Sequence, residues 1–227
     1  MVDQRKENYH YEEALKTLRT NIQFAGAEIT SILVTSCYPN EGKSDIVSQL
    51  AKEMGKAGKK VLLLDADIRK SAFIQRFQIE GEVKGLSQYL SGQVAVRDIL
   101  YTTNYANVDI IFAGPVAPNP SELLEGKLFA HLVEGLSQRY DYILIDTPPM
   151  ASVIDAAIVG GVCDGAILVI EDGTVGYRAA QKVKAQLEKS GSRVLGAVLN
   201  KVEMKKGKYY SYDKYGKYSK YGRYGKY

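Results

Sequence analysis

The sequence contains no tryptophan, two cysteines and six prolines in 227 residues. Two cysteines, Cys37 and Cys163, cannot build the disulfide framework of a small secreted domain, and their spacing matches no zinc motif. The best apolar stretch, residues 156–170, is interrupted by Asp164 and is shorter than the roughly 18 residues that a membrane-spanning helix needs. Residues 1–7 lack the apolar core of a signal peptide. We therefore expect a protein of the reducing cytoplasm without a membrane span.

The charge is unevenly distributed along the chain. The 30 Lys and Arg against 26 Asp and Glu give a net charge of +4, a balance that suggests nucleic acid or an anionic membrane as a partner. However, residues 205–227 hold eight basic residues and one acidic residue, whereas residues 1–204 hold 22 basic against 25 acidic. The basic character belongs to a tail, and we expect no nucleic-acid partner.

Short β-branched segments alternate with helical patterns through most of the sequence. Most of the segments are apolar throughout, which is typical of strands buried on both faces of a parallel sheet. This alternation predicts one three-layer α/β domain with a mostly parallel central sheet. The strands are predicted at 31–35, 61–65, 108–113, 142–146, 166–170 and 194–200, and the helices near 43–58, 121–139, 152–162 and 176–190.

Two further segments flank this alternating region. Residues 9–25 have a helical pattern and precede the first strand. Residues 205–227 consist almost wholly of Lys, Tyr and Gly, so they cannot bury a core and are predicted to be disordered. We expect a domain over residues 1–204 and a flexible tail over 205–227. The tail holds eight tyrosines: Tyr209, Tyr210, Tyr212, Tyr215, Tyr218, Tyr221, Tyr224 and Tyr227.

The strongest chemical signal follows the first predicted strand. Residues 37–44 read CYPNEGKS and place Gly42, Lys43 and Ser44 between an apolar strand and a helix, as a phosphate-binding loop requires. Backbone N–H groups at the helix start would face the phosphates, Lys43 would reach their oxygens and Ser44 would bind Mg²⁺. Cys37 stands where such loops usually have a glycine, so the motif by itself could be an ordinary helix start.

Carboxylates follow two other predicted strands. Asp65 and Asp67 end the second strand, and Asp146 ends the fourth. The carboxyl ends of parallel strands form the edge at which open α/β sheets bind ligands. A lone aspartate there is usually a turn former or a helix cap, but three beside a phosphate loop favour a site for ATP and Mg²⁺. One of Asp65 and Asp67 would bind metal and the other would accept a proton.

The sequence resembles the bacterial tyrosine kinases of capsule and exopolysaccharide systems, in their Gram-positive form with a separate membrane activator. The similarity extends over essentially the whole chain. The matching motifs are PNEGKS (39–44), LLLDADIRK (62–70), GPVAPNPSELLE (114–125), YILIDTPP (142–149), GAVLNKV (196–202) and the tyrosine cluster. The third and last motifs are more discriminating than the nucleotide motifs, which partitioning ATPases share.

The resemblance implies a P-loop NTPase fold and a role for each matching residue. It implies Lys43, Asp65, Asp67 and Asp146 as catalytic residues, and Asn200 near the adenine. The loop residues Pro39, Asn40, Glu41, Gly42, Lys43, Ser44 and Asp45 would complete the nucleotide site, and Ser44, Asp67 and Asp146 would hold Mg²⁺. The role of the Asn119–Leu124 motif does not follow from its chemistry.

This sequence departs from the family pattern at several positions. Asn40 replaces a glycine of the loop, and asparagine tolerates the left-handed backbone better than most residues. Asp45 replaces a threonine and places a carboxylate close to the phosphates, whose charge has the same sign. Ser71 stands where a proline is common. We expect these changes to weaken activity or to make it depend on an activator or a neighbouring copy.

The helical segment at the N-terminus carries Glu13, Lys16 and Arg19 on roughly one face. The family has Glu-x-x-Arg-x-x-Arg here and uses it to pack copies into a ring. In this sequence Lys16 replaces the middle arginine and loses its bidentate fork, which is expected to loosen assembly. An oligomer interface and a solvated charged stripe are both compatible with the pattern.

The tail has three interpretations: a nucleic-acid arm, a membrane-surface arm and an autophosphorylation substrate. Beside a kinase-like domain the third is favoured, and phosphorylation would reverse the charge of the tail and disassemble the ring. The expected partners are a membrane co-polymerase that recruits the chain to the inner face of the membrane, further copies of the chain and a tyrosine phosphatase. The alternatives are a partitioning or septum-positioning ATPase and a degenerate nucleotide-binding scaffold. Tyr38, where those ATPases usually have a lysine, argues against the first.

Overall fold

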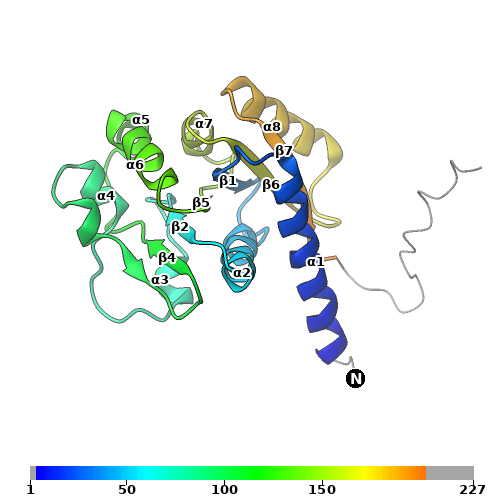
Figure 1. The fold of residues 1–227 in the computed structure, drawn as a ribbon. Helices are drawn as coiled ribbons and strands as arrows, with labels where there is room; N and C mark the ends of the chain where they lie inside the picture. Colours follow the sequence, from blue (N-terminus) through cyan, green and yellow to red (C-terminus); the bar gives the residue numbers. More distant parts are fainter. Residues whose placement is uncertain (1–3, 203–227) are drawn as a thin grey trace, which may run out of the picture.

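The computed structural model describes residues 4–202, with side chains from residue 9 onward, so the tyrosine cluster lies outside the described residues. One seven-stranded sheet, in the order β3-β4-β2-β5-β1-β6-β7, organises this part of the chain (Figure 1). All neighbouring strands pair in parallel except β3, which is antiparallel to β4. The strands are β1 (Ser31–Ser36), β2 (Val61–Asp65), β3 (Tyr101–Thr102), β4 (Val108–Ile111), β5 (Tyr142–Asp146), β6 (Gly165–Glu171) and β7 (Val194–Asn200).

Helices cover both faces of the sheet and make the predicted three-layer α/β fold (Figure 1). The helices α1, α2 and α3 pack on one face, and α4, α5, α6, α7 and α8 pack on the other. Their bounds are α1 (Gln4–Ala25), α2 (Lys43–Lys56), α3 (Phe73–Arg76), α4 (Leu86–Leu90), α5 (Pro120–Glu125), α6 (Lys127–Ser137), α7 (Asp155–Gly160) and α8 (Tyr177–Lys189), with a 3₁₀ turn η1 at Val96–Asp98.

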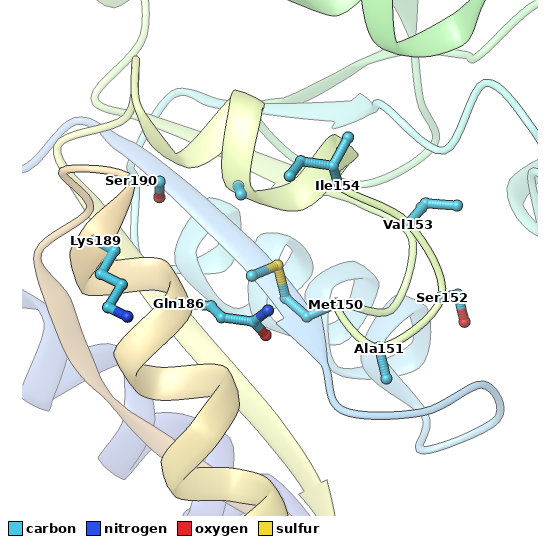
Figure 2. A pocket seen from close by; sticks show the side chains of 9 residues that line it. Met150, Ala151, Ser152, Val153, Ile154, Gln186, Lys189 and Ser190 are labelled. Carbon is cyan, nitrogen blue, oxygen red and sulfur yellow. The ribbon is translucent and has the colours of Figure 1, made fainter.

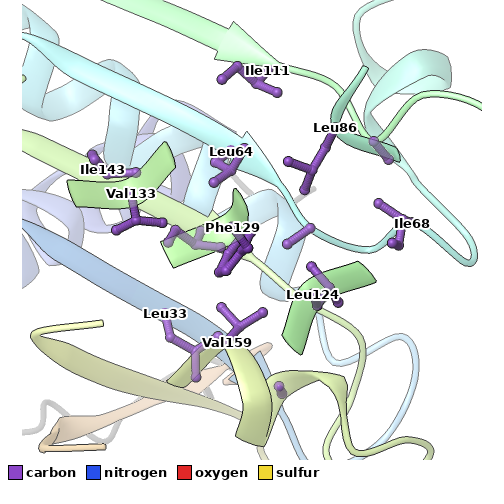
Figure 3. Packing of buried hydrophobic residues seen from close by; sticks show 14 of the residues in the cluster. Leu33, Leu64, Ile68, Leu86, Ile111, Leu124, Phe129, Val133, Ile143 and Val159 are labelled. Atoms are coloured by element: carbon purple, nitrogen blue, oxygen red, sulfur yellow. The ribbon is translucent and has the colours of Figure 1, made fainter. Parts of the chain in front are cut away.

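Alternating strand residues divide the core into two clusters. Leu33 of β1 packs with Phe129 of α6 and Val159 of α7 on one side of the sheet (Figure 3). Its neighbour Ile32 packs on the opposite side, with Leu50 of α2 among others. Because successive side chains point to opposite faces of a strand, an apolar strand such as β1 needs helices on both faces.

The predicted elements are present with some changes of extent. The helix expected over 121–139 is two helices, because Gly126 adopts an extended conformation (φ −64°, ψ 150°) between α5 and α6. The helix expected over 152–162 is shortened to α7, and the helix expected from residue 9 begins at Gln4. The two-residue strand β3 was not predicted, since its side chains are half-buried or exposed. None of the helices described has an apolar stretch long enough to span a membrane.

Candidate active site

The loop between β1 and α2 has the conformation that a phosphate-binding loop needs. Asn40 adopts a left-handed backbone with φ 68°, so asparagine keeps here a conformation that favours the glycine of the family pattern. Gly42 has φ 85°, and a Cβ atom there would lie 2.3 Å from Nδ2 of Asn200. Position 42 therefore requires glycine both for its backbone angle and for the close approach of Asn200.

Glu41 and the end of β7 brace this loop. The buried Glu41 carboxylate accepts a hydrogen bond from the Cys37 amide at 3.0 Å, so it points back into its own loop. Asn200 Nδ2 donates to the Glu41 carbonyl at 2.9 Å, and Lys201 Nζ donates to the Asn40 carbonyl at 2.6 Å. Burial raises the pKa of the Cys37 thiol to about 11, so Cys37 fills the start of the loop as an uncharged apolar group.

Lys43, Ser44, Asp67 and Asp146 meet at the carboxyl edge of the sheet. Ser44 Oγ donates to Asp146 Oδ2 at 2.6 Å, and Lys43 Nζ lies 3.2 Å from the same oxygen. Lys43 Nζ is also 4.0 Å from Asp67 Oδ2. The four groups are 12% exposed or less at the side chain or residue level, which strengthens their mutual electrostatics. The strands β2 and β5, which pair in parallel, bring Asp67 and Asp146 to one edge.

Asp65 lies deeper than Asp67. It is fully buried at the last position of β2, where Ser71 Oγ donates to Oδ2 and the Asp67 amide donates to Oδ1 at 3.2 Å. Burial, with the nearby Asp146 carboxylate, raises the pKa of Asp65 to about 8. Burial also raises the pKa of Asp146 against the opposing effect of Lys43. Both Asp65 oxygens thus accept hydrogen bonds from the chain itself.

The donor set fits a magnesium–nucleotide complex better than a metal site built of protein alone. Within residues 4–202, no group of three or more His, Cys, Asp or Glu is arranged to hold a metal. The edge instead offers the Ser44 hydroxyl with the Asp67 and Asp146 carboxylates, all oxygen donors. Mg²⁺ prefers such oxygens and commonly binds one or two carboxylates together with substrate phosphates.

The other loop residues lie at the rim of this site. Pro39 and Asn40 are exposed, and the Asp45 side chain is 60% exposed on the first turn of α2. Asp45 is paired with Arg76, the last residue of α3, whose Nη1 donates to Asp45 Oδ1. The charge at position 45 is therefore compensated by a side chain that is 31 residues away in sequence.

A second charged network explains part of the Asn119–Leu124 motif. The Arg69 guanidinium binds Asp155 at 2.6 Å through Nε and at 3.0 Å through Nη2. Ser121 accepts a bond from Arg69 Nη2 at 2.9 Å and donates to Asp155 at 2.8 Å. The Asp155 side chain has no exposed surface. This network ties the segment after β2 to the first turns of α5 and α7.

The N-terminal charges divide between solvent and the body of the protein. Glu13 and Lys16 form a 2.7 Å ion pair within α1, and each side chain is 46% exposed. Arg19 instead points toward α2, where Nη1 donates to Glu53 Oε1 at 2.9 Å in a partly buried contact. Glu13 and Lys16 thus share a solvent-facing surface of α1, whereas Arg19 serves an intramolecular contact in this chain.

A separate pocket of about 480 Å³ lies beside the loop that follows β5. Figure 2 shows Met150, Val153 and Ile154 from that loop on one side and Gln186 of α8 on the other. Lys189 is the one ionisable side chain in the lining of this pocket. None of the predicted site residues lines it, so it is not a candidate for phosphoryl chemistry.

The predicted residues Lys43, Ser44, Asp67 and Asp146 lie together at one edge of the sheet, but the residues that support this edge were not predicted. Arg69 and Ser121 lie within quoted motifs, so the motifs themselves marked them without giving their partner. No sequence pattern marked Asp155 or Arg76 as supporting residues, because a single charged residue at a helix end is common. Ser71 was noticed as a departure from proline, and its contact with Asp65 is one that proline cannot make.

Comparisons with known proteins agree with this geometry. Residues 40–189 match the family model described as an AAA domain. The chain is 42% identical over 201 residues to the tyrosine-protein kinase CpsD of Streptococcus agalactiae, covering 88% of each sequence. It is 39% identical over 202 residues to the tyrosine-protein kinase YwqD of Bacillus subtilis, covering 88% of this chain and 85% of that protein.

Solved structures distinguish the kinase from the partitioning ATPase. The kinase domain of the Escherichia coli tyrosine kinase ETK superposes with a TM-score of 0.82 at 34% identity, covering 88% of this chain and 79% of that one. The chimerical protein CapA2B2 gives 0.79 at 34% identity and 84% of both chains. The septum site-determining protein MinD of Pyrococcus horikoshii, complexed with Mg-ADP, gives 0.66 at 26% identity, covering 75% and 70%. The chain therefore belongs to the bacterial tyrosine kinases of capsule synthesis.

Proposed function

We propose that this kinase transfers phosphate from Mg-ATP to the C-terminal tyrosines of a neighbouring copy and thereby regulates the synthesis and export of an extracellular polysaccharide. The observation that carries the proposal is the meeting of Lys43, Ser44, Asp67 and Asp146 at one sheet edge. The high similarity to named tyrosine kinases supports the choice of acceptor.

The residues of the edge have distinct tasks in this proposal. Lys43 exchanges its contact with Asp146 for the phosphate oxygens and stabilises charge on the transferred group. Ser44 and Asp146 would hold Mg²⁺, which neutralises charge on the phosphates when bound. The tyrosine oxygen attacks the γ-phosphorus, the bond to the bridging β–γ oxygen breaks, and one of the two carboxylates after β2 accepts the tyrosine proton.

The exposure of the two carboxylates after β2 favours a division of their roles. Asp65 has no exposed surface, and both of its oxygens accept bonds from Ser71 and Asp67. Asp67 is 7% exposed and lies near Lys43. We infer that Asp67 is the carboxylate that meets the reactants, and that Asp65 acts by holding the turn after β2. Asp67→Asn should then lower kcat more than Asp65→Asn.

The nucleotide would bind along the loop 39–45 with its phosphates at the start of α2. Asn200, which reaches Gly42 from the end of β7, is placed beside this loop and would border the adenine. Asn40 and Gly42 supply the left-handed turns that let the loop backbone face the phosphates.

The proposed assembly is a ring of copies that a membrane activator recruits. Glu13 and Lys16 offer a solvent-facing surface on α1, and Arg19 borders it. The activator would place a cytoplasmic segment beside the kinase. The chain would thereby act at the inner face of the membrane, and a tyrosine phosphatase would reverse the modification.

Labelled ATP tests the proposed reaction. The full chain is incubated with Mg²⁺ and the activator segment, and phosphotyrosine is mapped by mass spectrometry. Label on Tyr209–Tyr227 that disappears in Lys43→Met supports the kinase. Phosphate release without label would instead support an ATPase switch, and neither product would support a scaffold.

A further inference from the structure

The residue that makes this phosphate loop unusual is Asp45. It follows Lys43 and Ser44 directly, on the first turn of α2, where backbone N–H groups and the helix dipole attract anions. Its carboxylate carries the same sign of charge as the phosphates that would bind there. Like charges about 4 Å apart repel each other by about 1 kcal/mol in bulk water, and by more where water is excluded, unless a cation intervenes.

Arg76 supplies that cation. Its Nη1 donates to Asp45 Oδ1, and its side chain is 26% exposed against 60% for Asp45. The phenol of Tyr11, from α1, lies within the field of both groups, and burial together with the Asp45 charge raises its pKa. Because the Asp45 side chain is 60% exposed, dissolved salt screens this pair.

The core holds Arg76 in place. α3 is a single turn, anchored by Phe73, which is fully buried and packs against Phe77 with ring centroids 6.1 Å apart. The Arg76 amide donates to the Ala72 carbonyl at 3.1 Å. The packing of α3 therefore fixes the backbone at Arg76 whether or not Asp45 is present, so only side-chain freedom is lost when the pair forms.

We propose that Arg76 is a positioning residue for nucleotide binding, which neutralises Asp45 so that a nucleoside triphosphate can occupy the start of α2. This inference rests on the proposed function, because it assumes that ATP binds at this loop. It predicts that the charge of Arg76 matters for ATP only while Asp45 is present.

A double-mutant cycle on the full chain tests this dependence. The dissociation constant of Mg-ATP is measured by calorimetry for the native chain, Arg76→Gln, Asp45→Ser and the double variant. We expect Arg76→Gln to weaken ATP binding about tenfold in the native background and less than about twofold beside Asp45→Ser. Arg76→Lys should keep most of the affinity, because it keeps the charge. Raising the salt concentration should reduce the loss in Arg76→Gln.

Arg97 provides a matched control. Its side chain is 89% exposed on η1, and Arg97→Gln makes the same change of charge without touching α3. This variant should bind Mg-ATP like the native chain. Melting curves for each variant detect a loss of folding, and if Arg76→Gln does not fold, Asp45→Ser still tests the proposal. Asp45→Ser removes the carboxylate while Arg76 remains, and this variant should bind Mg-ATP more tightly than the native chain.

Three results would overturn the proposal. An equal loss from Arg76→Gln in both backgrounds would mean that Arg76 contacts the nucleotide directly. No loss in the native background would mean that the pair is an ordinary surface ion pair. An Asp45→Ser variant that binds Mg-ATP no tighter than the native chain would mean that the carboxylate does not oppose the phosphates. Failure of the native chain itself to bind Mg-ATP would contradict the proposed function and is distinguished at once from these outcomes.

Discussion

Two arginine–aspartate pairs flank the candidate site, and they differ mainly in burial. Asp155 has no exposed side-chain surface and is held by two of the three guanidinium nitrogens of Arg69, Nε and Nη2, with Ser121 as a further partner. Asp45 is 60% exposed and is held by one nitrogen of Arg76. A buried carboxylate cannot exchange its partner for water, whereas an exposed one can. The first pair should therefore stabilise the fold, and the second should adjust ligand binding.

The largest expected effect is the loss of the buried partner. Arg69→Met leaves the Asp155 charge buried with Ser121 alone, and we expect the free energy of unfolding to fall by about 3 kcal/mol. Urea unfolding followed by far-ultraviolet circular dichroism suits a chain without tryptophan. Adding Asp155→Asn should recover part of the loss by removing the unpaired charge. If Arg69→Met lowered the free energy of unfolding by less than about 1 kcal/mol, the buried pair would contribute no more than an exposed ion pair does.

A pH-dependent effect of intermediate size is expected at Asp65. Its pKa, raised to about 8 by burial, means that the folded state binds this proton more tightly than the unfolded state. The contribution of Asp65 to stability is therefore full at low pH and is lost as the pH rises through about 8. In buffer without magnesium or nucleotide, Asp65→Asn should melt higher than the native chain at pH 9, by about 3 °C or more, and the gap should shrink toward pH 5.

Exposed Asp172 gives the control for this experiment. Asp172→Asn makes the same chemical change at the surface and should leave the pH dependence of melting unaltered. A gap between Asp65→Asn and the native chain that stays constant from pH 5 to pH 9 would show that burial of Asp65 carries no linked proton.

The partly buried pair of Arg19 and Glu53 should lie between the two extremes. Arg19→Met removes the donor while Glu53 remains 11% exposed, and we expect a loss of about 1 kcal/mol. Lys16→Met, in the exposed pair with Glu13, should cost less than about 0.5 kcal/mol. The order of these two urea midpoints tests whether the more buried ion pair contributes more to stability. Equal losses of unfolding free energy in the two variants would contradict that dependence on burial.

A small effect on stability is also expected at Arg76. Arg76→Gln should change the free energy of unfolding by less than about 1 kcal/mol, since its partner Asp45 can turn to water. The same variant should weaken Mg-ATP binding, so stability and affinity separate at this pair. If Arg76→Gln unfolded as readily as Arg69→Met, the Arg76–Asp45 pair would stabilise the fold as much as the buried Arg69–Asp155 pair does. The proposed difference between the two pairs would then be wrong.

The sequence was sufficient to predict the fold, and it predicted a set of site residues that the structure brings to one edge of the sheet, because both depend on local patterns. Apolar strands predicted the layers, and the carboxylates at strand ends predicted the edge at which Lys43 and Asp146 meet. Contacts between distant segments could not be predicted in the same way. The sequence of the one-turn helix α3 does not indicate that Arg76 contacts Asp45. No sequence pattern predicts that Arg69 binds Asp155, which is 86 positions away.

Because contacts between distant segments could not be predicted, the effects of some departures from the family pattern could be judged from the sequence and the effects of others could not. Asn40 could be judged from backbone preference alone, and its left-handed angle was correctly predicted. The effects of Asp45 and Ser71 depend on partners that the fold supplies. Ser71 replaces a ring that has no hydrogen-bond donor with a hydroxyl that holds Asp65. Side chains that look unfavourable in the sequence are thus compensated in three dimensions.

The central claim is that the edge built around Lys43 phosphorylates the C-terminal tyrosines of another copy. The most direct measurement mixes two chains with Mg-ATP and the activator segment: a Lys43→Met chain that keeps Tyr209–Tyr227, and a chain with native Lys43 that ends at residue 204. Phosphotyrosine is then mapped on each by mass spectrometry. Transfer between copies should label the tail of the Lys43→Met chain, and only when both chains are present. A Lys43→Met tail that stays unlabelled, while the native full-length chain labels itself, would contradict transfer between copies.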